Sequence, residues 1–375
     1  MFLKNIFVIL FKFKLQMTKN YLLILLLLLS SITYLSCSED GDDTYENIAP
    51  VQVDLTQVPY AKLSDYNFFD GELKNQNPAI GVLPYSPISS LFTDYASKKR
   101  FVWMPKNTKA TYNGAGEILE LPVGSAIIKT FYYDNVQPNN TTKIIETRIM
   151  IKKATGWIFA EYVWNEEQTD AFLDMNGSTT TIDWIKNGEP ISINYRVPAE
   201  AECFICHKEN NVAVPIGIKP QSLNATYTYA SGSMNQLQKW INVGYLENNL
   251  PSNINTVVDY SDTSQNLELR VRSYLDINCA HCHKEGSHCD YRPIRLAFNE
   301  TGIPVNLGIC VAPDENIDNA LTNIVTPNNF NRSVMHFRMN TTDEATKMPL
   351  IGRSVIHTEG VQLIEQWINT LTPCN

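Results

Sequence analysis

The sequence lacks several features that would place it in a familiar class. Its net charge is −9, and a negative chain is a poor nucleic-acid binder, because the phosphate backbone needs a basic surface. Its longest apolar run has about 14 residues, short of the ~20 that span a bilayer as a helix. Neither tandem repeats nor low-complexity segments are visible, which excludes solenoids. With 44% hydrophobic and 18% charged residues, the chain has an ordinary globular composition.

The N-terminus has the pattern of an export signal. Residues 1–36 contain four lysines, no acidic residue and the apolar run YLLILLLLLSSITYL, as a secretory signal peptide does. Met1 and Met17 are both suitable starts, because the segment from Met17 carries the basic and apolar parts of the signal by itself. A membrane-spanning helix is the alternative, which the short run disfavours.

Cys37 lies directly after this run and before a cluster of acids, in SCSEDGDD. The arrangement resembles a bacterial lipoprotein signal, in which the cysteine becomes the lipidated first residue, although Tyr34 matches it imperfectly. This resemblance implies an outer-membrane lipoprotein, held by its lipid on the periplasmic or the cell-surface face. Residues 37–60 are polar and acidic, and we expect them to form a tether.

The predicted secondary structure of the rest of the chain changes at Pro198. Residues 61–197 contain short β-branched and aromatic runs divided by Asn, Gly and Pro clusters, which predicts a β-sandwich or jelly roll. Beyond Pro198, apolar side chains recur at helical spacing, most clearly at residues 234–246, 267–278 and 358–371. The sequence therefore predicts a β-rich domain followed by a mostly α-helical region.

Two five-residue motifs carry the clearest chemistry, CFICH at 203–207 and CAHCH at 279–283. Thiols three positions apart reach the two vinyl groups of one haem, and the histidine that follows can ligate the iron. The pattern CxxCH is therefore typical of c-type haem attachment, and it predicts two covalently bound haem c groups. The predicted attachment and iron-ligating residues are Cys203, Cys206, His207, Cys279, Cys282 and His283.

Two other interpretations of these cysteines are a zinc site and a redox dithiol. A four-cysteine zinc site needs the two motifs to converge across 76 positions of sequence, and it leaves both adjacent histidines unexplained. A redox dithiol would make the histidine after each pair a coincidence.

The segments on either side of the second motif follow a regular order. A helical segment precedes Cys279, Met348 stands in TKMPLIG, and a helical segment with Trp367 ends the chain. This order resembles the small single-haem cytochrome c domain, whose sixth iron ligand is a methionine in a loop before the last helix, and Met348 fits that role. The rival ligands are Met335, His336 and Met339, which stand in a helix-like segment and fit a core.

The first motif has a less regular frame. Only a short turn of helix after Pro198 precedes it, and residues 246–278 contain neither Met nor His. Met234 and Met104 are the candidate sixth ligands, although each fits a structural role better. An open iron at the His207 haem is the alternative.

Three cysteines remain after Cys37 and the motifs. An oxidising compartment favours pairing, and Cys289 and Cys310 flank one apolar run, so we predict a disulfide between them. Cys374 would then be unpaired.

The chain as a whole resembles a family of bacterial dihaem c-type cytochromes, largely uncharacterised, that have a β-rich N-terminal region. The resemblance covers about residues 61–371 and supports the six motif residues and Met348. We expect a multi-domain α+β fold: a β-sandwich or jelly-roll-like domain, then a mostly α-helical dihaem region. The expected parts are a signal peptide 1–36, a tether 37–60, a β-rich domain 61–197, a first haem region 198–266 and a second cytochrome domain 267–375.

Three functions are compatible with these features. The first is electron transfer in the cell envelope to an unidentified redox partner, which should be basic or small because the mature chain is acidic. The second is a peroxidase-like oxidoreductase with an open iron at the first haem, so the sequence leaves open whether the protein is an enzyme. The third is a carbohydrate- or partner-binding β module. Its candidate residues are Trp103, Trp157, Trp164 and Trp184, with an acidic cluster at Glu166, Glu167 and Asp170.

Overall fold

The computed structural model describes residues 50–374. The predicted signal peptide, Cys37 and the first part of the predicted tether lie outside the described residues. The described residues belong to one compact unit, so the predicted β-rich domain and both haem regions share it. Among them, no helix is long and apolar enough to cross a membrane.

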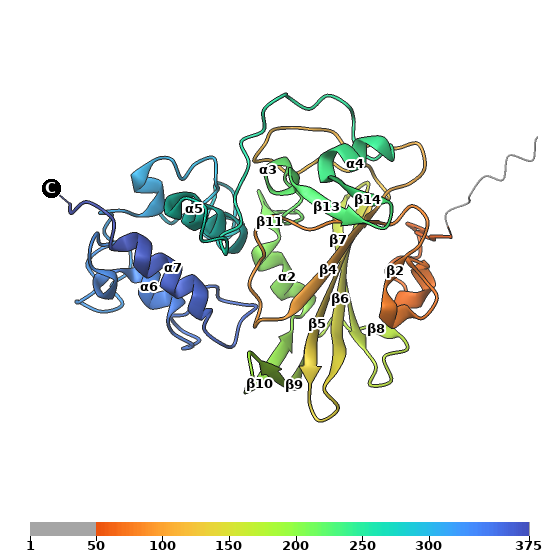
Figure 1. Cartoon of the computed structure of the whole chain (residues 1–375), viewed down its shortest axis with the longest axis horizontal. Coiled ribbons are helices and arrows are strands. Elements are labelled where there is room, and N and C mark those ends of the chain that lie inside the picture. Colours follow the sequence, from red (N-terminus) through yellow and green to blue (C-terminus); the bar gives the residue numbers. More distant parts are fainter. Residues whose placement is uncertain (1–49, 375) are drawn as a thin grey trace, which may run out of the picture. The chain divides into compact units, whose positions relative to one another are not determined.

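An eight-stranded antiparallel sheet lies at the centre of this unit (Figure 1). Its order is β10-β9-β5-β6-β7-β8, with β4 beside β5 and β3 beside β4. The predicted strand segments are all found in it. Its strands are β3 Leu83–Pro84, β4 Ser97–Trp103, β5 Ala126–Val136, β6 Thr141–Lys153, β7 Gly156–Trp164, β8 Ala171–Leu173, β9 Ser178–Lys186 and β10 Glu189–Val197.

Both faces of the central strands β5, β6 and β7 are buried, and this explains why these strands read as nearly continuous apolar runs. In β5, Ala126 and Ile128 belong to one core, whereas Ile127 belongs to another on the opposite face. The first core is closed by the chain that precedes the sheet, where Val51 packs against it and Val58 is buried. The prediction of a tether up to residue 60 is therefore wrong for residues 51–60.

The predicted β-sandwich or jelly roll is also wrong. In the described part of the chain, the remaining sheets have two strands each, so no second large sheet packs on the first. Loops, short helices and the β9–β10 hairpin cover the faces instead, and that hairpin packs Trp184 and Tyr195 against Tyr133 of β5. The small sheets pair β1 Phe69–Asp70 with β2 Asn77–Pro78, β11 Lys208–Glu209 with β12 Val212–Ala213, and β13 Thr226–Tyr229 with β14 Gly232–Asn235.

The prediction of a mostly α-helical second half is also wrong, because residues 50–374 are β-rich, with about 19% helix against 27% strand. The predicted helices exist, but they are short, and long loops rich in Asn, Pro and Gly join them. Such residues favour turns and end helices. The α-helices are α2 Glu200–Cys206, α3 Pro220–Leu223, α4 Gln236–Asn242, α5 Leu267–Asn278, α6 Val334–Met339 and α7 Thr358–Ile368, and the 3₁₀ helices are η1 Leu63–Tyr66, η2 Leu73–Asn75, η3 Pro304–Leu307 and η4 Phe330–Arg332.

Helix α5 positions the second motif. The Asn266 side chain caps its first turn by accepting a hydrogen bond from Leu269 N at 3.2 Å. The apolar face of α5 packs against α7 in a separate core that includes Leu275 and Ile364. Because α5 ends at Asn278, the next residue, Cys279, starts the motif from a fixed position.

Candidate functional site at the two CxxCH motifs

The first motif is built on α2, at the end of β10. The backbone N–H of Ala199 donates to the Glu202 carboxylate at 2.7 Å, which fixes the start of the helix. Cys203 and Cys206 are three residues apart, so one helical face presents both thiols. His207 follows at the helix C-terminus, as the sequence predicts.

His207 has its ring orientation fixed by the backbone. Its Nδ1 lies 2.9 Å from the carbonyl oxygen of Val214, which leaves Nε2 for another partner. Burial lowers the pKa of His207 to about 4, so the ring is neutral, the form that ligates metals. A ligating histidine usually has its second nitrogen bonded to a carbonyl in this way.

A cavity, here called the sheet-side cavity, lies between this motif and one face of the sheet. Cys203, Cys206 and His207 line it, and so do Arg100 and Lys129 of the sheet. Its volume is about 1250 Å³, including the space that opens to solvent.

A second cavity, here called the helix-side cavity, lies beside α5. Cys279, His283 and Met348 line it together, so the structure brings the predicted methionine to the predicted histidine across 65 positions of sequence. Its volume is about 1020 Å³, again including open space. Burial lowers the pKa of His283 to about 4, and among the described residues its Nδ1 has no hydrogen-bond partner.

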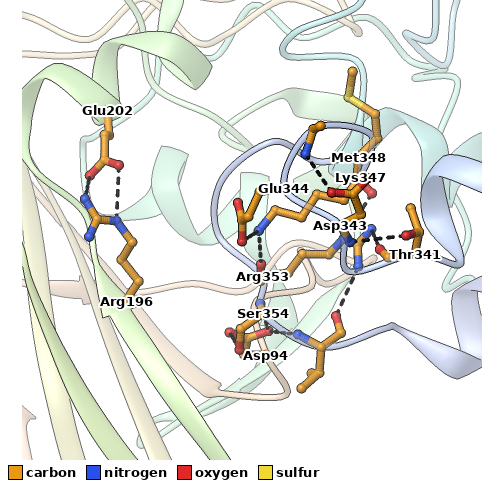
Figure 2. A network of polar contacts seen from close by, with 12 residues as sticks. Asp94, Arg196, Glu202, Thr341, Asp343, Glu344, Lys347, Met348, Arg353 and Ser354 are labelled. Carbon is orange, nitrogen blue, oxygen red and sulfur yellow. Dashed lines mark hydrogen bonds and ion pairs between the residues drawn. The ribbon is translucent and has the colours of Figure 1, made fainter. Parts of the chain in front are cut away.

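Arg353 holds the segment that carries Met348, as Figure 2 shows. Its guanidinium donates to the carbonyl oxygens of Met348 at 3.0 Å, Thr341 at 2.8 Å and Arg338 at 2.9 Å. The backbone N–H of Met348 donates to the same Arg338 carbonyl at 2.8 Å. The position of the methionine is therefore fixed through its own backbone.

Asp94 ties the same segment to the sheet region. Its carboxylate accepts hydrogen bonds from Ser354 N at 2.7 Å, Ser354 Oγ at 2.9 Å and Val355 N at 3.1 Å (Figure 2). Arg196 of β10 forms a two-pronged ion pair with Glu202 of α2 in the same view. Sequence reasoning missed these contacts, because they join residues that are far apart in the chain or carry no motif.

The rival ligands have different positions. Met335 and Met339 of α6 line the helix-side cavity and remain alternatives to Met348. His336 does not line it, and its Nε2 lies 2.7 Å from the Glu365 carboxylate. His336 is therefore a structural residue of the α6–α7 contact.

At the first motif the expected sixth ligands do not line the cavity. Met104 is buried in the core, and Met234 is 37% exposed on β14. Met150 of β6 and His281 do line the sheet-side cavity, and sequence reasoning missed both. The available signal for His281 was its place inside CAHCH.

The two motifs lie side by side. Ligand atoms of Cys206, His281 and Cys282 all lie within 4.8 Å of one another. The interaction between the two thiols lowers the pKa of Cys206 and raises that of Cys282, while burial acts to raise both. This is the convergence that a shared metal site requires, although Cys203 and Cys279 are not part of the cluster.

The loops after the two motifs are also joined. Asn210 N donates to the carbonyl oxygen of Gly286 at 2.8 Å, and Lys284 forms an ion pair with Glu209 at 2.5 Å. Gly286 has φ +72°, and a Cβ there would lie 2.4 Å from the Asn210 side chain. Only glycine fits this approach without a shift of Asn210.

A buried charged group forms part of the sheet wall. Arg148 of β6 donates to the Glu146 carboxylate at 2.5 Å and lies 3.4 Å from Glu161, while the Tyr195 hydroxyl donates to Glu146 at 2.5 Å. Burial raises the pKa of Glu161 well above its usual range, and the nearby Glu146 charge adds to it. The pKa of Glu146 is lowered, because Arg148 outweighs its burial. Glu146 is thus ionised, and Glu161 retains its proton more readily.

We expect Glu161→Gln to stabilise the protein at pH 8 and to change little at pH 5. A carboxyl whose pKa is raised by folding does not destabilise the folded state at pH values well below its usual pKa. The destabilisation grows as the pH rises toward the pKa of the folded state. The gain should be about 1 kcal/mol or more at pH 8, since one pKa unit corresponds to about 1.4 kcal/mol. Urea unfolding at both pH values measures it.

The matched variant is Glu146→Gln, which should lose about 3 kcal/mol at pH 8, because it removes the ionised partner of Arg148. Equal effects of the two variants at pH 8 would contradict the assignment of the charge to Glu146.

The disulfide prediction is wrong. Cys310 pairs with Cys374, and Cys289 is free and buried. The chain after α7 returns along the segment that follows Cys310, where Asn328 N donates to the Ile368 carbonyl at 2.9 Å. Cys289 is held near the second motif instead, since its N–H donates to Cys282 O at 2.9 Å.

The candidate binding features of the β-rich region have structural roles. Trp164 and Trp184 are buried, and Trp103 and Trp157 pack partly buried against the cores, so they form no shared exposed platform. In the acidic cluster, Asp170 caps η1 by accepting from Ser64 Oγ at 2.6 Å. The cluster's other contacts include an ion pair of Glu166 with Lys143 at 2.8 Å.

Comparison with family models, curated proteins and solved structures finds no match for this chain. The resemblance to dihaem c-type cytochromes therefore stays a prediction, and the functional argument depends on the geometry of the two cavities.

Proposed function

We propose that the protein is a dihaem c-type cytochrome that transfers electrons in the cell envelope. The observation that carries this proposal is the division of the motifs between two adjacent cavities, with His207 in one and His283 with Met348 in the other. Zinc or dithiol chemistry gives no reason for a separate cavity at each histidine. An exported lipoprotein anchored through Cys37 would place such a carrier at the outer membrane.

The side chains present fit one haem in each cavity. Each cavity offers a buried, neutral imidazole, at least one motif thiol in its lining, and mostly apolar walls. Haem, when bound, supplies one-electron exchange at its iron, and a methionine opposite histidine raises its potential. The chain's own part is to hold the ligands: Arg353 fixes the backbone of Met348, and the Val214 carbonyl fixes the ring of His207.

The proximity of the motifs supports an electron relay. Cys206 and Cys282 belong to different motifs, and yet their sulfur atoms lie within 4.8 Å of each other, so groups attached through them would be neighbours. Two neighbouring haems would allow an electron to pass from one to the other inside a single chain. The redox partner is unidentified, and the acidic surface favours a basic or small one.

A redox titration with absorption and EPR spectra, on protein produced with a c-type maturation system, tests this function. We expect two one-electron steps and two low-spin haems. Carbon monoxide added to the reduced protein should not bind. A high-spin haem that binds carbon monoxide would favour the oxidoreductase alternative with an open iron at the His207 haem, whose motivation is that Met104 and Met234 do not line that cavity.

A metal site is the second candidate function, and the cluster of Cys206, His281 and Cys282 favours it. These are ligand types and spacings that suit zinc, with a fourth position for water or substrate. Metal analysis of the purified protein separates the two functions. One equivalent of bound zinc without covalent haem, with the zinc lost in His281→Ala, would show that the protein is a zinc protein and not a cytochrome.

A further inference from the structure

We propose that Arg100 and Lys129 form a carboxylate-binding site on the sheet wall of the sheet-side cavity, with Arg148 beside them. The site rests on the proposed function, because the carboxylates that suit it best are the two propionates of a haem held at Cys203, Cys206 and His207. A free small carboxylate is the other source of the same chemistry.

Cross-strand pairing places these cations in one row. Arg100 of β4 pairs with Lys129 of β5, Lys129 pairs with Arg148 of β6, and Arg148 pairs with Glu161 of β7. Directly paired residues in a sheet present their side chains on the same face. The row therefore crosses four adjacent strands, and all four of these side chains line the sheet-side cavity.

The charges in this row do not balance. Arg148 has the ionised Glu146 as its counter-charge and also lies 3.4 Å from Glu161. Arg100 is only 8% exposed, and in the described part of the chain it has no hydrogen-bond or ion-pair partner for its guanidinium. Lys129 is partly buried and forms no ion pair there, although the Glu146 charge opposes the lowering of its pKa, and its ammonium lies 4.8 Å from the centre of the Phe131 ring.

A buried cation without a counter-charge is costly, so both groups favour an anion that enters the cavity. The pKa of Lys129 is lowered well below its usual range by burial and by the nearby Arg100, Lys98 and Arg148 charges. A bound carboxylate would reverse this effect. Two such cations, one guanidinium and one ammonium, match two carboxylates, and a guanidinium suits the planar carboxylate group.

The position of the row fits a haem held by α2. That helix packs against β7, whereas Arg100 lies on β4, three strands away. Strands are spaced by about 4.8 Å, so the two ends of the row are roughly 14 Å apart. The vinyl and propionate groups of haem are on opposite edges of the ring, so thioether bonds at α2 direct the propionates toward the cations.

The test compares the double variant Arg100→Gln/Lys129→Gln with the control Lys99→Gln. Lys99 is the neighbour of Arg100 on β4, but it points to the other face of the sheet, where its ammonium lies near Tyr132. None of the three residues is an attachment residue, so the covalent haem content should not change. The readouts are the reduction potentials of the two haems, the haem content and the effect of added succinate.

We expect the double variant to lower the reduction potential of one haem by at least 59 mV, which corresponds to a tenfold change in the equilibrium of a one-electron reduction. Removing cations disfavours the more negative, reduced haem. The other haem and the Lys99→Gln protein should be unchanged. If the shift appears without succinate, the propionates are the ligand. A wild-type potential that responds to succinate, with the response lost in the double variant, identifies a free carboxylate instead.

Unchanged potentials with two haems attached and no response to succinate would overturn the carboxylate site and leave the proposed function standing. If no haem is attached, the proposed function fails, and the site is then tested by titrating succinate into the haem-free chain by calorimetry. Binding by the wild type and not by the double variant would retain a free-carboxylate site, and binding by neither would overturn it.

Discussion

Met348→Ala should open the iron of the helix-side haem and lower its potential on the order of 0.1 V, within the range of about 0.8 V that axial ligands control. Met348 lines the same cavity as His283. Alanine has no atom that can ligate iron, so the haem should become high-spin and bind carbon monoxide. EPR spectra and a redox titration measure both changes.

Met335→Ala is the matched control, because Met335 is a buried core residue of the same cavity. It should cost about 2–5 kcal/mol of stability through the cavity it leaves, while the helix-side haem stays low-spin. The reverse result, with low-spin haem lost in Met335→Ala and retained in Met348→Ala, would transfer the ligand role to Met335.

Arg353→Met should destabilise the protein by about 3 kcal/mol or more. The variant keeps much of the side-chain volume but leaves the carbonyl oxygens of Met348 and Thr341 without their donor, at about 1–3 kcal/mol for each unsatisfied buried group, and leaves Arg338 O only the Met348 N–H. Since the same bonds fix Met348, carbon monoxide should also compete for the helix-side iron. Urea unfolding and the carbon monoxide spectrum measure the two effects.

Arg196→Met serves as the control for Arg353. The Arg196 side chain is 52% exposed, and its ion pair with Glu202 should contribute no more than about 1 kcal/mol. Both arginines are drawn in Figure 2, where one meets a carboxylate and the other a group of backbone carbonyls. A loss below 1 kcal/mol in Arg353→Met would contradict a role in holding the Met348 segment.

Local patterns in the sequence predicted local structure well. Apolar spacing located α5 with its bounds, and the β-branched runs located β5, β6 and β7, because the period of side chains along one element depends only on nearby residues. The motif at Cys279 and its relation to Met348 were also readable, since the order of helix, motif, methionine and helix is carried by the chain itself.

Features that depend on distant contacts were not readable. The meeting of Cys206 with Cys282, the Asp94–Ser354 bond and the Cys310–Cys374 disulfide each join segments far apart in the chain. The sandwich prediction failed for a related reason: strands buried on both faces have the same composition whether a second sheet or loops cover them. Helix content after Pro198 was overestimated because short helical segments were extended across Asn- and Pro-rich loops.

The cations of the sheet wall are another feature that depends on distant contacts and could not be predicted from the sequence. Nothing near Arg100 or Lys129 in the sequence marks them as a site, since charged residues on a strand usually face solvent. Only the register of β4, β5 and β6 places them in one row and inside the cavity.

The central claim is that each CxxCH motif attaches one haem, and the intact mass of the purified protein tests it most directly. The chain is produced with a c-type maturation system, together with a Cys203→Ser/Cys206→Ser variant and a Cys279→Ser/Cys282→Ser variant. We predict a mass increase of two haems for the wild type and of one haem for each variant, after denaturation. A wild-type chain of unmodified mass would contradict the account.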